Sequence, residues 1–167
     1  MKGSKTQRTR RKEPVTSKAR KPPAQSFQTR LEQFPMLLTE SVMTTPAICV
    51  GPQDTLAKVE ELFETHDFNS LPVVDGSRLI GIVTKFDFLK NFIFTAESII
   101  PHYSELMRRR VIKVMTREVC IVHPSTPVTR VLQMMIESRN KSFPVVDDSN
   151  SVVGVISRGN VIKALRG

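Results

Sequence analysis

A run of residues near the middle of the chain brings together a hydroxyl, an ammonium group and a carboxylate where a strand should pass into a helix. The run is Gly81-Ile-Val-Thr84-Lys85-Phe-Asp87. Backbone N–H groups at a helix start lack intrahelical partners, and the helix dipole favours anions there. A phosphate could therefore bind beside Thr84, with Lys85 neutralising its charge. The Asp87 carboxylate could accept strong, charge-assisted hydrogen bonds from both hydroxyls of a ribose.

The same two residues also fit a purely structural role. Thr-x-x-Asp is the pattern of a capping box, in which the Thr84 hydroxyl and the Asp87 carboxylate satisfy backbone N–H groups at the helix start. The two roles are compatible, because a ligand can share or displace a cap. We favour the ligand role for this pair.

A second run, Ser157-Arg158-Gly159-Asn160, has the same layout near the end of the chain. Ser157 keeps the hydroxyl, and Arg158 is a candidate phosphate ligand because of its charge. Asn160 replaces the carboxylate with a neutral amide, which can still accept a bond from ribose. Bonds to neutral groups are weaker by about 1 kcal/mol. The sequence therefore predicts weaker binding, or an empty cleft, at the second site.

The two runs belong to a set of blocks that occur twice, in the same order. Two of the blocks recur 72 residues later and the third recurs 73 residues later, with one residue inserted in a turn. Matching blocks at a fixed spacing indicate an internal repeat. The paired blocks are residues 41–44 with 113–116, 70–75 with 142–147, and 79–87 with 152–160.

Each repeat is predicted to fold in the order β-α-β-β-α, from apolar residues at helical spacing and short β-branched runs between turns. Asp54, and either Ser125 or Thr126, are the predicted caps of the longer helices. The predicted elements are strands 47–50, 70–74 and 79–83 with helices 56–65 and 85–92, then strands 120–122, 142–146 and 152–156 with helices 128–138 and 158–165.

A repeat of this size is marginal as an independent domain. We therefore expect the two copies to pack their sheets together about a pseudo-two-fold axis and to bury a shared core. The predicted fold class is α+β, with two β-α-β-β-α repeats behind a disordered basic tail. The predicted boundaries are 1–34 for the tail, 35–98 for the first repeat, and 99–167 for the second repeat with the linker before it.

The Val-Met-Thr, Pro-Val-Val-Asp and Gly-Ile-Val-Thr-x-x-Asp blocks, taken together in both copies, resemble a tandem CBS domain pair, or Bateman module, over about residues 36–167. The resemblance implies a regulatory module for an adenosine-containing ligand such as AMP, ADP, ATP or S-adenosylmethionine. It implies that the matching Thr and Asp hold phosphate and ribose. It also implies a homodimer, and a change of geometry on ligand binding that acts on a protein partner in trans.

Family position also suggests where adenine would bind, in a narrow apolar slot with backbone hydrogen-bonding groups. For any one of these residues a role as ordinary strand-edge core is equally compatible with the sequence. The prolines remove a ladder donor, which suits an edge that faces a cleft. The first slot would comprise Thr44–Ile48 with Leu71 and Pro72, and the second would comprise Thr116–Cys120 with Phe143 and Pro144.

We predict that the protein is not an enzyme, because no nucleophile–base pair, paired carboxylates or Walker-type loop is present. His66, His102 and His123 lack metal-ligand spacing, so no metal site is expected. Cys49 and Cys120 are expected to be reduced, in a cytoplasmic protein. No apolar run is long enough to span a membrane. The only expected cofactor-like group is the regulatory adenosine ligand.

The net charge of +9 resides entirely in the first 30 residues, which hold ten Lys or Arg and one acidic residue. So polar a segment cannot offset its ordering entropy and should be disordered. It could contact nucleic acid, an anionic membrane or an acidic protein, or serve only as a solvated extension. Without interleaved aromatic residues, sequence-specific nucleic-acid readout is not expected. The alternative function is thus a ligand-free CBS dimerisation protein whose tail binds an anionic partner.

Overall fold

The structure is a computed structural model that describes residues 32–93 and 103–166. The predicted disordered tail falls almost entirely on residues 1–31, outside the described part of the chain. Phe34, the last residue assigned to the tail, begins the first 3-10 helix and is buried in an apolar core at 6% exposure.

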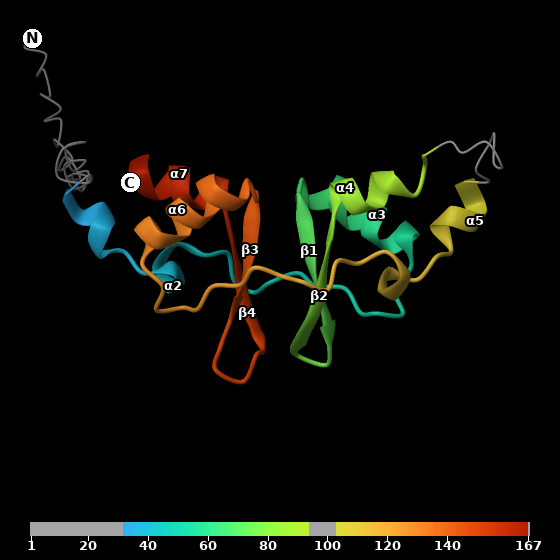
Figure 1. The fold of residues 1–167 in the computed structure, drawn as a ribbon, viewed down its shortest axis with the longest axis horizontal. Helices are drawn as coiled ribbons and strands as arrows, with labels where there is room; N and C mark the ends of the chain where they lie inside the picture. Colours follow the sequence, from blue (N-terminus) through green and yellow to red (C-terminus); the bar gives the residue numbers. More distant parts are fainter. Residues whose placement is uncertain (1–31, 94–102, 167) are drawn as a thin grey trace, which may run out of the picture.

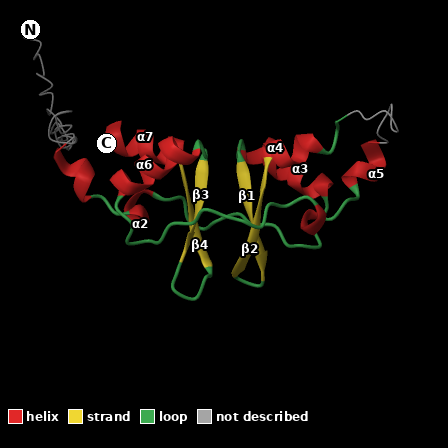
Figure 2. Ribbon diagram, viewed as in Figure 1, coloured by secondary structure: helices red, strands yellow, loops and turns green. Residues whose placement is uncertain are grey.

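The described residues form two similar halves related by a pseudo-two-fold axis, with the hairpins at the centre and helices on both flanks (Figures 1 and 2). This mixed helix and strand architecture confirms the predicted α+β class. In chain order the elements are η1 (Phe34–Met36), α2 (Thr39–Val42), α3 (Leu56–His66), β1 (Ser70–Asp75), β2 (Arg78–Thr84), α4 (Lys85–Lys90), α5 (Tyr103–Met107), η2 (Val111–Lys113), α6 (Val128–Ser138), β3 (Ser142–Val146), β4 (Val152–Ser157) and α7 (Arg158–Arg166).

The helices and hairpin strands occur where their hydrophobic patterns predict them, and α6 has the predicted bounds. The predicted caps of the longer helices are wrong. The residues at the cap positions of α3 and α6 are Thr55 and Pro127, and neither makes a side-chain cap bond. Asp54 instead accepts a bond from the Gly51 N–H at 2.7 Å, and Thr126 accepts one from the His123 N–H at 3.0 Å. Both side chains therefore stabilise the preceding turn.

The first predicted strand of each repeat is also wrong, because it is reduced to one bridged residue. Val50 pairs with Val73, and its N–H donates to the Pro72 carbonyl while its carbonyl accepts from Val74. The next bond of a parallel ladder would need an N–H from Pro72, which proline lacks. The ladder therefore stops, and the preceding segment leaves the sheet.

The second repeat shows the same interruption. Val122 bridges Val145, donates to the Pro144 carbonyl at 3.1 Å, and accepts a bond from the Val146 N–H at 3.0 Å. Pro144 cannot supply the next donor. In both repeats the residues just before the bridge are thus left beside the sheet and not within it.

Each half of the molecule is completed by the leading segment of the other repeat. Thr44 pairs with Val155 of β4, and Thr116 pairs with Ile82 of β2. The two segments pass each other at the centre of the molecule (Figure 1).

Two close contacts fix this exchange. A Cβ atom on Gly154 would lie 2.6 Å from the Met43 sulfur, and one on Gly81 would lie 2.7 Å from the Met115 sulfur. The absence of a side chain at each glycine therefore lets the crossing segment pack directly on the strand.

The structure has two apolar clusters in place of the single shared core that we expected. Val111 and Met115, from the leading segment of the second repeat, are buried in the cluster of the first repeat. Phe34 is buried in the cluster of the second repeat, and Met43 packs against it. The physical reason is the segment exchange, which lets each small sheet bury one face without stacking on the other sheet.

Direct hydrogen bonds also join the two hairpins. At their tips, the Leu79 N–H donates to the Asn150 carbonyl and the Val152 N–H donates to the Ser77 carbonyl, both at 3.0 Å. At their other ends, the hydroxyls of two serines at equivalent repeat positions, Ser70 and Ser142, lie 2.7 Å apart. The halves therefore contact each other at both ends of the hairpins.

Candidate functional site

Two clefts lie between the repeats, one on each side of the paired serines. We call them the Asp87 cleft and the Asn160 cleft. The Asp87 cleft encloses about 400 Å³ and is lined by Asn69, Ser70, Ile82, Thr84, Lys85, Phe86, Asp87, Lys90, Thr116, Glu118, Val119, Cys120, Arg139, Asn140, Lys141 and Ser142. The Asn160 cleft encloses about 160 Å³ and is lined by Thr44, Pro46, Ala47, Ile48, Asp67, Phe68, Asn69, Ser70, Ser142, Val155, Ser157 and Asn160.

The crossing segments form one wall of each cleft. Because Pro72 and Pro144 end the parallel ladders, the residues before Val50 and Val122 stand off from β1 and β3. Their backbone and side chains then face the strand-to-helix turn of the other repeat. Both clefts are therefore built from both halves of the chain.

In the Asp87 cleft, Thr84 and Asp87 form the capping box that their spacing predicts. The Asp87 Oδ2 accepts bonds from the Thr84 N–H at 3.1 Å and from the Thr84 hydroxyl at 2.7 Å. The Asp87 N–H donates to the Thr84 Oγ1 at 3.0 Å. These bonds fix the carboxylate at the start of α4, which is shorter than predicted, with six residues.

The second carboxylate oxygen of Asp87 faces the cleft. Oδ1 accepts bonds from the Lys90 ammonium at 3.1 Å and from the Thr116 hydroxyl at 3.4 Å. Asp87 is only 6% exposed, whereas the Lys90 side chain is 52% exposed. A ligand hydroxyl can thus replace the long Thr116 bond or the solvated Lys90 contact while the cap stays intact.

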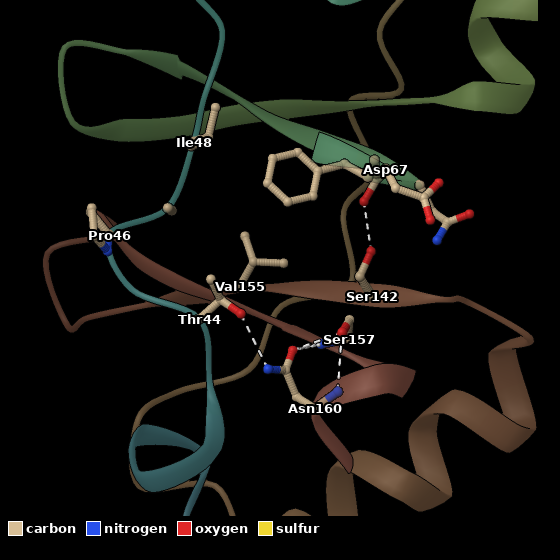
Figure 3. A pocket seen from close by; sticks show the side chains of 12 residues that line it. Thr44, Pro46, Ile48, Asp67, Ser142, Val155, Ser157 and Asn160 are labelled. Atoms are coloured by element: carbon tan, nitrogen blue, oxygen red, sulfur yellow. Dashed lines mark hydrogen bonds between the residues drawn. The ribbon is translucent and has the colours of Figure 1, made fainter. Parts of the chain in front are cut away.

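The same cap forms in the Asn160 cleft, but here the group beside the cleft is a hydrogen-bond donor and not an acceptor. Asn160 Oδ1 accepts bonds from the Ser157 N–H at 2.8 Å and from the Ser157 hydroxyl at 2.7 Å. Its Nδ2 donates to the Thr44 hydroxyl at 3.2 Å, as Figure 3 shows. The amide orientation is fixed because its oxygen must accept the backbone N–H.

This geometry corrects one expectation from the sequence. We expected Asn160 to accept a hydrogen bond from a ribose hydroxyl, but its oxygen is used by the cap. The group that faces Thr44 and the cleft is an NH2 donor. Asn160 therefore offers its cleft neither the negative charge nor the free acceptor that Asp87 offers in the other cleft.

The leading segment of each predicted adenine slot lies beside the capping pair of the other repeat, whereas we had assumed that it lies beside the capping pair of its own repeat. Thr44 and Ile48 lie with Ser157 and Asn160, not with the first capping box. Thr116 lies with Asp87. The reason is that each segment crosses to the sheet of the other repeat.

The strand residues of the two predicted slots line neither cleft. Leu71 and Phe143 are buried in the two cores, at 0% and 1% exposure. Pro72 and Pro144 are also buried, and they act indirectly by ending the ladders.

The two cations expected to hold phosphate are placed differently. Lys85 lines the Asp87 cleft and forms an ion pair with Asp67 at 3.2 Å. Arg158 does not line the Asn160 cleft. It lines an apolar groove between α6 and α7, where its guanidinium donates to the carbonyls of Asn140 at 3.1 Å and Arg139 at 2.7 Å. A phosphate role for Arg158 therefore has no support in this geometry.

Several cleft residues are absent from the sequence-based site. Asn69, Ser70 and Ser142 line both clefts, and Arg139 and Lys141 line the Asp87 cleft. The serines could have been found from the repeat, since they occupy equivalent positions at the start of the Pro-Val-Val-Asp strands. No sequence signal points to Arg139 or Lys141, because they belong to a turn of the other repeat.

Both cysteines are free, with Cys120 exposed and Cys49 partly buried. Desolvation by burial raises the pKa of the Cys49 thiol above its usual value. Within residues 32–93 and 103–166 no cluster of metal-ligating side chains occurs. The helices of that same part of the chain include none with the length and apolarity needed to cross a membrane.

The match to a family model agrees with this architecture. The model of the CBS domain matches twice, over residues 39–93 and 104–167. The chain therefore belongs to the CBS domain family, as a tandem pair.

Curated relatives include proteins of different lengths from Methanocaldococcus jannaschii. The chain is 25% identical over 155 residues to the uncharacterized protein MJ1426, covering 78% of this chain and 92% of the relative. It is 29% identical over 125 residues to an inosine-5'-monophosphate dehydrogenase, covering 74% of this chain but 23% of that enzyme. Another relative, MJ1232, is matched over 36% of its length. The chain thus covers only about a quarter to a third of the length of two of these three relatives.

Solved structures with the same fold include two with adenosine compounds. The CBS domain pair of protein MJ0100, in complex with 5'-methylthioadenosine and S-adenosyl-L-methionine, is 25% identical with a TM-score of 0.63, covering 76% of this chain and 94% of that one. CBSX2 in complex with AMP is 25% identical with a TM-score of 0.65 and the same coverage of both chains. The same protein from Arabidopsis thaliana, in another structure, is 26% identical with a TM-score of 0.66, covering 76% and 92%.

Proposed function

We propose that this chain is a regulatory module that binds an adenosine-containing ligand in the Asp87 cleft. The observation that carries the proposal is the Asp87 carboxylate, which is 6% exposed and whose Oδ1 is directed into a cleft of about 400 Å³. A cleft of this size lies within the range of small-molecule sites. The two solved relatives that hold adenosine compounds support the ligand class.

The chemistry of the cleft fits the parts of such a ligand. The Asp87 Oδ1 can accept a ribose hydroxyl in place of Thr116 or Lys90. Ile82 and Val119 supply apolar surface for a purine ring, since small-ligand sites combine apolar walls with a few polar groups.

The regulatory part of the proposal rests on how the cleft is built. Thr84 and Asp87 come from the first repeat, whereas Thr116 and Lys141 come from the second. A ligand that contacts both repeats shifts the equilibrium between their relative arrangements, because it favours the arrangement that binds it more tightly. We propose that a protein partner in trans responds to that change, and that the module acts as a homodimer in the cytoplasm without catalysing a reaction.

Isothermal titration calorimetry of the full chain with AMP, ATP and S-adenosylmethionine tests the ligand class. Asp87→Ala should weaken the binding of AMP and ATP, while Asp75→Ala removes an exposed carboxylate outside both clefts and should have no effect. Melting curves of both variants separate loss of binding from loss of folding.

The outcomes distinguish the candidates. Binding that survives Asp87→Ala in a folded variant would overturn the residue assignment. If none of the three compounds binds, and mass spectrometry of the native protein finds no adenosine compound, the proposal fails. The chain would then act as a ligand-free interaction protein.

A further inference from the structure

The two clefts differ in the charge of their walls. Four cations line the Asp87 cleft, together with two carboxylates. Among the described residues that line the Asn160 cleft, Asp67 is the only charged one, and it is negative. The cations of the Asp87 cleft are Lys85, Lys90, Arg139 and Lys141.

Two of these cations are already engaged. Lys90 pairs with Asp87 at 3.1 Å and Lys85 pairs with Asp67 at 3.2 Å. Within the described part of the chain, no carboxylate lies within ion-pair distance of Arg139 or Lys141. These two cations follow α6 and face the cleft from the second repeat, opposite the capping box.

The position of Arg139 is fixed by the backbone. It is the C-cap residue of α6, with φ of 59°, and its carbonyl accepts a bond from the Arg158 guanidinium. The Lys141 ammonium donates to the Asn69 side-chain oxygen at 3.4 Å, which is a long bond to a neutral group. An anionic ligand could therefore bind both cations without first breaking an ion pair.

The Asn160 cleft has the opposite character. Its polar groups include the Asn160 amide, the Thr44 and Ser157 hydroxyls and the Asp67 carboxylate, and Figure 3 shows Asp67 across the cleft from Asn160. Its volume is also less than half that of the Asp87 cleft. Its lining offers no positive charge to a phosphate chain.

We propose that the two clefts sort adenosine ligands by charge. The Asp87 cleft selects adenosine compounds that carry a phosphate chain, and Arg139 and Lys141 are the residues that bind the chain. The Asn160 cleft accepts uncharged or cationic adenosine compounds, such as adenosine or a sulfonium derivative, and excludes the phosphorylated ones. This inference rests on the proposed function, which requires only that some adenosine compound binds in the Asp87 cleft.

The first test uses calorimetry of the full chain with ATP and with adenosine. Arg139→Gln combined with Lys141→Gln should weaken ATP by about two- to thirtyfold, the range expected from losing two exposed charge contacts. Adenosine should be unaffected. A control with Arg130→Gln and Lys163→Gln removes the same charge from exposed positions outside both clefts and should change neither ligand.

The second test blocks one cleft at a time. Ala47 and Val119 occupy equivalent repeat positions, and each lines one cleft. Val119→Phe should abolish ATP binding and spare adenosine in the other cleft. Ala47→Phe should abolish the binding of S-adenosylmethionine and leave the binding of ATP unchanged.

The results separate this inference from the function on which it rests. If no adenosine compound binds, the proposed function fails. If adenosine compounds bind but ATP and adenosine weaken equally in the Arg139 and Lys141 variant, sorting by charge is wrong. Sorting is also wrong if ATP binding survives Val119→Phe in a protein that melts normally.

Discussion

Exchanging the two cap residues between the repeats tests the role of the carboxylate directly. Asp87→Asn gives the first cleft the polar group of the second, and Asn160→Asp does the reverse. The Asn160 geometry shows that an amide completes the cap, with its oxygen accepting both the backbone N–H and the hydroxyl of the preceding Ser157. Asp87→Asn should therefore keep the cap and lose only the acceptor that faces the cleft.

The expected magnitudes follow from these contacts. Asp87→Asn removes an ion pair with Lys90, whose side chain is 52% exposed, so the cost in folding stability should stay below about 1 kcal/mol. The ligand loses its charge-assisted bond to Oδ1, which is worth about 2 kcal/mol. The affinity should therefore fall by about thirtyfold. Asn160→Asp should let the second cleft accept ribose hydroxyls and should strengthen binding there.

Calorimetry of both single variants and the double variant, with melting curves for each, measures these effects. For a protein of this length, the expected stability loss corresponds to a melting shift of at most about 4 °C. The reasoning is refuted if Asp87→Asn binds within twofold of the original chain. It is also refuted if Asp87→Asn unfolds far more easily, because the carboxylate would then be needed for the fold.

Four further expectations concern the crossing segments and the cysteines. Gly81→Ala should destabilise the protein by about 1–3 kcal/mol in urea unfolding, because the new Cβ would lie 2.7 Å from the Met115 sulfur; a loss below 0.5 kcal/mol would argue against the tight packing. Cys120 is exposed and lines the Asp87 cleft, so saturating ATP should slow its alkylation. Cys49 should react more slowly than Cys120 near pH 8, since burial raises its pKa and lowers its thiolate fraction; equal rates would contradict this. Pro72→Ala should supply the missing ladder donor, draw the crossing segment toward β1 and weaken ligands of the Asn160 cleft, as titration would detect.

The repeat pattern predicts the secondary structure well, because hydrophobic periodicity is a local property of the sequence. It predicts α6 over its full length and places all four hairpin strands. The predicted caps are wrong because a side chain such as Asp54 can accept a hydrogen bond either from the start of the following helix or from the preceding turn. In the fold it accepts the Gly51 N–H of the preceding turn.

The candidate site is predicted only in part, for a different reason. The capping pairs and their asymmetry are visible because they lie within four residues. Their partners are not visible, because Thr44 and Asn160 are 116 positions apart and meet only when the segment crosses. A repeat gives equivalent positions in its two copies, but it does not say which copy a preceding segment packs against. The polarity that Asn160 presents to the cleft also depends on which of its atoms the cap uses.

The segment exchange has a consequence for how such a chain could arise. A single repeat with its own leading segment contains the part that a second copy needs to complete its sheet, since Met43 packs on Gly154 and Met115 packs on Gly81. Two separate copies could thus complete each other as a strand-swapped pair. Joining them in one chain makes that association intramolecular, at an effective concentration in the millimolar range. Once the copies are fused, identical subunits are no longer required, and one copy can carry a carboxylate where the other carries an amide.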